Sequence, residues 1–403
     1  DSVRVIANLV KVPEGSLLWS GRFTRPFEQV AALQGDIARA ISDSLKLNLS
    51  ERDRATLGRQ PTSSSAAYDL YLKGRRAIVL ATPLGSALGR TMLDSTRVYL
   101  RGALAIDSNF AAVHALASSY HQIAAFRGWA PFKENMDSAL VAGARALELD
   151  STLGGAWVVL IARNMYLQDD WEATRRIVTS ALRLAGHDPT ILQLSAIYLG
   201  EVEKRLDSAL VLANRAVQIE PTTADLNTLG DLYMRARRYD SAIVALRHAI
   251  ELDSSVPAPY RRLLTSYEAL GRYPDAIAIR RKMGDGSSAA EFERAFSTGG
   301  KAAYQRLERL ELERRADSLI AGLARPRAIP ADTVPPSPEA KVAQVYAQLG
   351  DWPRAMDWIL KERAIRPGRF RTYITNPDFA GLRADPRFLP LVREAGLEAL
   401  LNR

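Results

Sequence analysis

The stretch from Leu226 to Asp285, LNTLGDLYMRARRYDSAIVALRHAIELDSSVPAPYRRLLTSYEALGRYPDAIAIRRKMGD, repeats itself with a period of 34 residues. The period is visible in four positions, because Leu229, Tyr233, Tyr239 and Ala242 recur as Leu263, Tyr267, Tyr273 and Ala276. A period of this length is typical of a helix-turn-helix unit, whose apolar face is buried only when copies stack on one another. The repeat therefore predicts an elongated helical solenoid with a concave groove that holds another macromolecule.

Further helical pairs are predicted on both sides of this stretch. The spacing of apolar residues places the pairs at 66–80 with 88–106, 109–126 with 132–149, and then within 155–185, 189–219, 223–252 and 257–283. Their ends also repeat, since GALAIDS, RALELDS, RAVQIEP and HAIELDS each finish with an acid followed by Ser or Pro. A hydroxyl that caps the next helix, or a proline in its first turn, would explain this pattern. The fold class is mainly α, an α-α superhelix.

The first residues follow a different pattern. Two β-rich runs, SVRVIANLV and SLLWSGRF, are separated by KVPEG, whose proline and glycine favour a turn, so they predict a β-hairpin. From Phe27 to Leu49 the apolar residues fall three or four apart, which predicts one amphipathic helix. A hairpin and a single helix make a poor independent core, so this segment is interpreted as the back half of a partial α/β domain.

The composition of the chain suggests domain boundaries. GRQPTSSS at 58–65 is typical of a linker, and so is RPRAIPADTVPPSP near 324–338, which contains five prolines. Between them, 66–323 reads as the solenoid, with a break at FSTGG. Residues 1–57 form the partial α/β segment, and 339–403 form a terminal helical pair followed by a turn and a capping helix. A stack of repeats needs such an end to cover its last apolar face.

Composition also bounds the partners. The 403 residues are 47% hydrophobic and 25% charged, as in a folded globular protein, and the net charge of +9 is interleaved with 45 acids. A nucleic-acid surface needs basic residues gathered on one face, so no nucleic acid is expected as a partner. No apolar run is long enough to span a bilayer and no signal peptide is visible, so any anchor is expected outside this sequence.

The sequence shows no catalytic or metal-binding pattern, so the chain is predicted to be no enzyme and to bind no cofactor or metal. The absence of cysteine removes disulfides, thiol nucleophiles and sulfur-ligated zinc. The glycine pairs at 154–155 and 299–300 lack the flanking residues of a phosphate loop. His114 and His121 lie two helical turns apart and could contact a ligand. The interpretation as two polar groove residues is favoured, because metal sites usually have three or four ligands with fixed spacing.

The units resemble tetratricopeptide repeats, in which small and large apolar residues alternate so that two antiparallel helices pack closely. The resemblance is strongest around Gly230 and Ala242, whereas Arg280 stands where the family has a large apolar residue. In that family the first helix of each unit lines the groove. Carried onto this chain, the resemblance implies these partner-binding residues: His114, Ser118, His121, Val158, Ala162, Met165, Leu192, Ala196, Leu199, Asn227, Asp231, Met234, Arg235, Arg261, Thr265 and Glu268.

The chemistry of this predicted groove indicates the kind of partner. Its middle would be apolar and its ends polar, which suits a helix or an extended peptide of another protein. The carboxylate clamp by which related repeats bind chaperone tails is not predicted, because Asp231 would repel a carboxylate beside Asn227. An alternative is that the chain's own proline-rich segment fills the groove.

The amino-terminal segment resembles the back half of a TolB-like domain, through VRVIANLV, LLWSGRF and ALQGDIARAI. The ending LRADPRFLPLVREAGL is similar to the ends of the same bacterial architectures, where a kinase, cyclase or DNA-binding output domain and a membrane span commonly precede the repeats. The resemblance implies a non-catalytic sensor or assembly module of a membrane-linked signalling protein, on the periplasmic side, with membrane contact indirect or through sequence outside this chain. The alternatives are a scaffold subunit of a larger membrane-associated complex and a cytoplasmic location.

Overall fold

The computed structural model describes residues 2–11, 14–26, 30–45, 60–81, 87–168, 170–284, 286–323, 337–365, 369–398 and 401. The chain divides into two compact units, Asp1–Val159 and Leu160–Arg403. Both are built mainly from helices, and a two-stranded sheet lies at the start of the first unit. The predicted fold class is confirmed.

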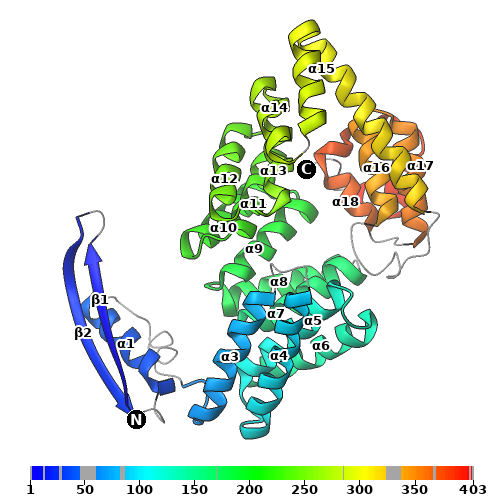
Figure 1. Ribbon diagram of the computed structural model, residues 1–403. Coiled ribbons are helices and arrows are strands. Elements are labelled where there is room, and N and C mark those ends of the chain that lie inside the picture. The colour runs from blue at the N-terminus through cyan, green and yellow to red at the C-terminus, as the bar shows by residue number, and fades with distance from the viewer. Residues whose placement is uncertain are drawn as a thin grey trace. The chain divides into compact units, whose positions relative to one another are not determined.

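The first unit begins with the predicted hairpin. Strands β1 (Ser2–Lys11) and β2 (Ser16–Pro26) are antiparallel, with Val5 opposite Phe23 and Leu9 opposite Trp19. Alternate residues of each strand are half-buried, as a one-sided sheet requires. Helix α1 (Val30–Ser44) contacts β2 (Figure 1). The flanks of the predicted helix, 27–29 and 46–49, lie outside the described residues.

Four further helices of the first unit form two antiparallel pairs. Helix α3 (Ser65–Ala81) packs on α4 (Ala87–Ile106), and α5 (Ala111–Phe126) packs on α6 (Phe132–Leu149). Alanines at the contacts are fully buried, among them Ala103 in α4 and Ala146 in α6. Small side chains at these positions let the helix axes approach closely, which is the pattern that the sequence predicts.

The second unit is also built from helical pairs. Helix α7 (Gly154–Ala162) crosses the boundary between the units. The elements that follow are η2 (Arg163–Gln168), α8 (Trp171–Ala185), α9 (Pro189–Ile197), η3 (Tyr198–Val202), α10 (Leu206–Ile219), α11 (Thr223–Arg235), α12 (Tyr239–Leu252), α13 (Pro257–Ala269) and α14 (Tyr273–Lys282). From α8 to α14 each helix packs on the next one along the chain, as in a solenoid. At Gly230 a Cβ atom would lie 2.6 Å from the Leu246 side chain, so only glycine allows α11 and α12 to pack this closely.

The turns of the repeats depend on acids more than on hydroxyls. The carboxylate of Asp253 accepts the backbone N–H of Ser255 at 2.9 Å, and that of Asp150 accepts the N–H of Thr152 at 3.0 Å. The acid therefore organises these turns, rather than the serine that follows it, which corrects the predicted capping role. Thr222 does cap a helix, since its side chain accepts an N–H from the first turn of α11.

The end of the second unit departs from the repeat. Helix α15 (Gly286–Leu323) is interrupted at Gly300, whose φ of 57° lies in the left-handed region, which confirms the predicted break. Helices α16 (Pro338–Gln348) and α17 (Trp352–Ile365) form another pair, followed by α18 (Phe370–Thr375), η5 (Pro377–Ala384) and α19 (Phe388–Glu394). These elements share one apolar core with the second half of α15. Most of the predicted proline-rich linker, 324–336, lies outside the described residues, and the predicted domain boundaries stay predictions.

Candidate partner-binding face

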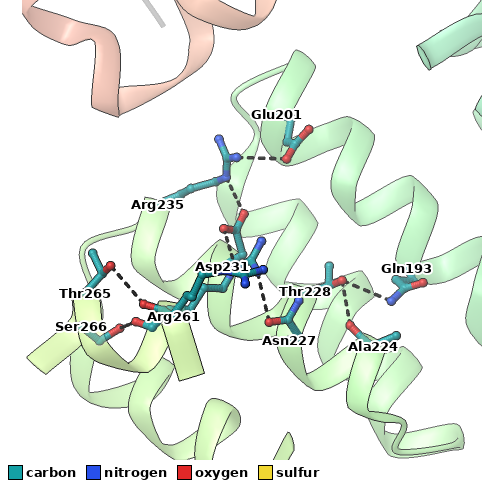
Figure 2. A network of polar contacts seen from close by, with 11 residues as sticks. Gln193, Glu201, Ala224, Asn227, Thr228, Asp231, Arg235, Arg261, Thr265 and Ser266 are labelled. Carbon is teal, nitrogen blue, oxygen red and sulfur yellow. Dashed lines mark hydrogen bonds and ion pairs between the residues drawn. The ribbon is translucent and has the colours of Figure 1, made fainter. Parts of the chain in front are cut away.

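The first helices of three successive hairpins lie side by side. Helix α11 contacts α9 on one side and α13 on the other, so these helices present one continuous surface, called the first-helix face below. On α11, Asn227, Asp231 and Arg235 are spaced by one turn each and point to the same side (Figure 2). This surface is where the repeat resemblance places a partner.

Asp231 is the centre of a polar cluster on this face. Its carboxylate accepts hydrogen bonds from Arg235 Nε at 2.7 Å and from Arg262 Nε at 3.0 Å. The guanidinium of Arg235 also donates to Glu201 Oε1 at 3.0 Å, and that of Arg262 donates to the amide oxygen of Asn227 at 3.2 Å. Two acids and two arginines therefore neutralise one another on the first-helix face (Figure 2).

Three side-chain hydrogen bonds on the first-helix face join positions about one repeat apart in the sequence. The side chains of Gln193 and Thr228 are 35 positions apart in sequence, as are those of Asn227 and Arg262, and Glu201 and Arg235 are 34 apart. The hydrogen bonds thus form a ladder that links each first helix to the next. The ladder fixes the orientation of neighbouring repeats in addition to their apolar packing.

The ladder holds Asp231 in its charged form. Partial burial opposes ionisation of its carboxyl, but the charges and hydrogen bonds of Arg235 and Arg262 outweigh that effect and lower the pKa of Asp231 to about 2. The same contacts raise the pKa of Arg235, against the effect of burial. The charge of Asp231 is therefore compensated within the chain, and the predicted repulsion of a partner's carboxylate stays a prediction.

Several predicted partner-binding residues lie together on this face. Asn227, Asp231 and Arg235 belong to the ladder, and Arg261 and Thr265 are exposed on α13. Met234 packs against the apolar core between α12 and α14 instead. Glu268 turns away from the ladder and accepts hydrogen bonds from Arg280 and Tyr304.

The apolar groove floor predicted from the sequence is not present. Met165 and Leu192 are almost completely buried, as are Ala162 and Ala196, so they pack between helices and are not exposed to a partner. Val158 and Leu199 are half-buried, and Leu199 packs against the core of α10 and α11. The expectation was wrong because a residue that does not pack within its own hairpin can still be buried by the next hairpin of the stack.

In the first unit the predicted residues make local contacts. Ser118 is buried and donates a hydrogen bond to the Ala139 carbonyl oxygen at 2.8 Å, so the prediction that it lines a groove is wrong. His114 Nε2 lies 2.9 Å from the Ser108 carbonyl oxygen, and His121 Nδ1 lies 3.0 Å from Asn135 Oδ1. Within the described ranges no three His, Asp or Glu side chains are grouped so that they could hold a metal ion.

Four members of the ladder were missed by sequence reasoning: Gln193, Glu201, Thr228 and Arg262. The available signal was the repeat itself, because each lies 34 or 35 positions from a polar residue on the next or preceding first helix. Arg262 was passed over because its neighbour Arg261 occupies the position that the family exposes. In the structure Arg262 reaches back to α11, whereas Arg261 remains exposed.

A second polar cluster anchors α15 to the repeats. Arg280 is buried, with its guanidinium carbon 3.8 Å from the centre of the Phe292 ring, and it donates to Glu268 at 3.0 Å and to Glu311 at 2.7 Å. Tyr304 donates to the same Glu268 oxygen at 2.7 Å. An arginine thus replaces the apolar residue of the repeat because α15 brings acids and aromatic rings to this position.

This second cluster predicts a dependence of stability on pH. Burial, and then the charge of Glu268, raise the pKa of Glu308 to about 7. A raised pKa means that the folded chain keeps a proton that the unfolded chain loses near pH 4.5, so stability falls as pH rises from about 4.5 to 7. Glu308→Gln is expected to remove this loss and to raise the free energy of unfolding by about 1–2 kcal/mol at pH 8, discounted for partial exposure.

The measurement is thermal unfolding followed by circular dichroism at pH 5 and pH 8. Glu313→Gln is the matched control, because Glu313 lies on the same helix and is about half exposed beside Arg309. The control is expected to keep the pH dependence of the unsubstituted chain. A Glu308→Gln variant with the same pH dependence as this control would contradict the assignment.

The chain is similar in part to one curated protein and to several solved structures. No family model matches the sequence. The chain is 26% identical over 153 residues to a putative adenylate cyclase 3 of Rhizobium meliloti (strain 1021), and the match covers 38% of this chain and 25% of that protein. The chain thus matches only a quarter of the length of this curated relative.

Solved structures that are similar include repeat proteins. A thermophilic TPR protein of Thermus thermophilus, TTC0263, is 15% identical, with 48% of this chain and 98% of that chain covered and a TM-score of 0.37. The Cut9–Hcn1 hetero-tetramer of the APC/C is 17% identical, with 70% and 54% covered and a TM-score of 0.44. The helical hairpins, their period and their close packing define a tetratricopeptide-like solenoid fold.

The helices that the structure describes differ from membrane-spanning helices. Each of them is too short or too polar to cross a bilayer.

Proposed function

We propose that this chain is a non-catalytic protein-interaction module that binds a segment of a partner protein on its first-helix face. The observation that carries the proposal is the alignment of α9, α11 and α13, with Arg261 and Thr265 exposed beside a ladder that is already neutral. A neutral, ordered polar surface suits a protein segment with mixed polar groups. It suits a polyanion less well, because the arginines of the ladder are paired with acids.

The absence of catalysis is part of the proposal. The carboxyl groups with shifted pKa values among the described residues include Asp231, Glu268 and Glu308. Asp231 accepts a hydrogen bond from Arg262 of the neighbouring helix α13, and Glu268 accepts one from Arg280 of α14. Glu308 lies on α15 beside the cluster of Glu268 and Arg280. We assign structural roles to these groups, because ion-pair networks between helices also shift pKa values.

We further propose that the module is the sensor or assembly part of a bacterial membrane-linked signalling protein, on the extracytoplasmic side. Support comes from the resemblance of the amino-terminal hairpin and helix to a TolB-like domain, and from the partial similarity to a putative adenylate cyclase. The rival role is a scaffold subunit of a larger membrane-associated complex. The two roles differ in whether the partner is bound conditionally or permanently.

The test is site-specific photo-crosslinking in the native host. A photoreactive phenylalanine replaces Arg261 or Thr265 on the first-helix face, and Val244 on α12 as the control, because Val244 is 69% exposed on a second helix of a repeat. Protein adducts are expected from positions 261 and 265 and not from 244. Adducts from the control alone, or adducts only with nucleic acid, would refute the proposed face.

The yield of adduct separates the two roles. One partner captured at near-stoichiometric yield under all growth conditions supports the scaffold. A partner whose yield changes with growth conditions supports the sensor.

A further inference from the structure

The C-terminal helices return to the repeats at one place. Helix α18 contacts η3, and the hydroxyl of Thr375 donates to the backbone carbonyl oxygen of Glu201, which is 174 positions away in the sequence. Glu201 is also the acid that pairs with Arg235 in the ladder. The chain from η3 through α15 to α18 therefore closes on itself beside the end of the first-helix face.

A buried charge pair lies at the same contact. Arg371 of α18 is 9% exposed, and its Nη2 atom lies 3.6 Å from Oε1 of Glu203 just after η3. Glu203 accepts shorter hydrogen bonds from Arg175 at 2.8 Å and from the Tyr198 hydroxyl at 2.7 Å. Glu203 is thus held by its own repeat, and Arg371 is the additional, more distant cation.

The pairing of Arg371 is incomplete. Its Nε atom is buried and has no hydrogen-bond partner among the described residues. Burial, together with the charge of Arg175, also lowers the pKa of the Arg371 guanidinium, although Glu203 acts in the opposite direction. A buried cation with one long ion contact and an unpaired N–H makes the contact weak, because water would satisfy both groups once the contact opens.

The C-terminal helices do not depend on this contact for their own core. Phe370, Tyr373 and Ile374 of α18 pack with α16, α17 and α19, in a core separate from that of the repeats α9 to α13. The serine cap of α16 and the Tyr373 hydroxyl both bond to the buried carboxylate of Glu362, which ties this core together. Release of Arg371 and Thr375 therefore leaves a folded set of helices.

We propose that α18 is an intramolecular latch, in which Arg371 and Thr375 hold the C-terminal helices on η3 and their release uncovers the adjoining end of the first-helix face. The next element, η5, extends the contact, because Asp378 lies close enough to Arg235 and Asp231 for their charges to act on it. The latch differs from the sequence-based alternative, in which the proline-rich segment covers the groove. It goes beyond the proposed partner binding, since it concerns the chain alone.

The test is the distance between the C-terminal helices and the repeats, measured in the chain without any partner. The sequence contains no cysteine, so cysteines at Val211 on α10 and Leu389 on α19 are the only attachment sites for a pair of spin labels. Both positions are exposed, at 67% and 42%. The labelled chain without further substitutions is expected to give one narrow population of distances between the two labels.

Two variants each disrupt one contact of the latch. Arg371→Glu places a second carboxylate against Glu203, and Thr375→Glu places a bulky anion against the Glu201 carbonyl, so each is expected to abolish the narrow population in favour of a broad, longer one. Arg393→Glu is the control, because this substitution makes the same charge reversal away from the contact. Arg393 lies on α19 and is 70% exposed. Hydrogen exchange of α16 reports whether the C-terminal core stays folded.

Loss of the narrow population in both latch variants, with α16 still protected and the control unchanged, supports the latch. A narrow population retained in either variant with α16 protected, or loss of α16 protection in both, overturns it, because the contact would then be absent or part of one core. Since no partner is present, this result is independent of the crosslinking result.

Discussion

Replacing Arg280 with alanine is expected to lower the free energy of unfolding of the α13–α15 region by about 3–5 kcal/mol. The guanidinium is buried and satisfies Glu268, Glu311 and the Tyr304 hydroxyl at once. Alanine would leave Glu268 as an uncompensated anion between helices, and it would remove the cation from the face of the Phe292 ring.

The measurement is native-state hydrogen exchange of the α14 and α15 amides, which reports opening of this region separately from the rest of the chain. Arg281→Ala is the matched control, because Arg281 is the next residue and its pair with Glu293 is 57% exposed on both sides. Exposed pairs of this kind contribute little to stability, so the control should exchange like the unsubstituted chain. Equal protection in the two variants would show that the buried cluster does not stabilise α15.

A double variant separates the charge from the packing. Arg280→Met restores the apolar residue of the repeat pattern but leaves Glu268 charged, so it is expected to be almost as damaging as alanine. Adding Glu268→Gln removes the unpaired charge and should recover part of the lost stability, since replacing both members of a buried pair is often well tolerated. Failure of the second substitution to recover any stability would assign the loss to shape alone.

Arg280 also shows how far the sequence could be interpreted. The 34-residue period predicts the hairpins correctly, because Gly230, Ala242 and their equivalents fix how closely two helices pack. The same period marks Arg280 as an exception without giving a reason. The reason lies in Glu311, which is 31 positions away on a helix whose direction the repeat pattern does not specify.

The candidate face was predicted in part, for a similar reason. Helical spacing is enough to place Asn227, Asp231 and Arg235 on one side of α11. It cannot tell whether the neighbouring hairpin covers a residue, and that is why Leu192 and Met165 are buried instead of exposed. Contacts within one repeat are encoded locally, whereas contacts between repeats depend on how the hairpins stack.

Two features were not accessible to local patterns at all. The element η3 is a π-helical turn whose extra residue is reflected in the sequence only as an enlarged turn after Tyr198. The contact of Thr375 with Glu201 joins positions 174 apart, and no periodicity relates them. Both features lie at the same end of the first-helix face, where the proposed latch contacts η3. The latch was therefore the least predictable part of the site.

Asp231→Asn is expected to lower the free energy of unfolding of the α9–α13 region by about 2–3 kcal/mol at pH 7. Asp231 is only 24% exposed and is the shared anion of Arg235 and Arg262, so an amide there leaves two partly buried cations facing each other. The figure follows from a pKa lowered from 3.8 to about 2, at about 1.4 kcal/mol per unit.

The sign of the pH dependence gives this prediction its sharpest test. Because the pKa of Asp231 is lowered on folding, its contribution to stability is complete above pH 3.8 and is lost as pH falls towards 2. Urea unfolding should therefore separate Asp231→Asn from the unsubstituted chain at pH 7, and the separation should begin to shrink below pH 3.8. Asp207→Asn is the control, since Asp207 is 93% exposed beside Arg238. This substitution is expected to change neither the stability at pH 7 nor its dependence on pH.

A difference between Asp231→Asn and the unsubstituted chain that stays constant down to pH 3 would contradict the role of Asp231 as a charged bridge. It would mean that the hydrogen-bonding shape of the side chain matters and its charge does not. The predicted decrease would instead show that ion pairs join successive repeats on the first-helix face. In that case the carboxylate of Asp231, which joins α11 to α13, also fixes the arrangement of side chains on the first-helix face.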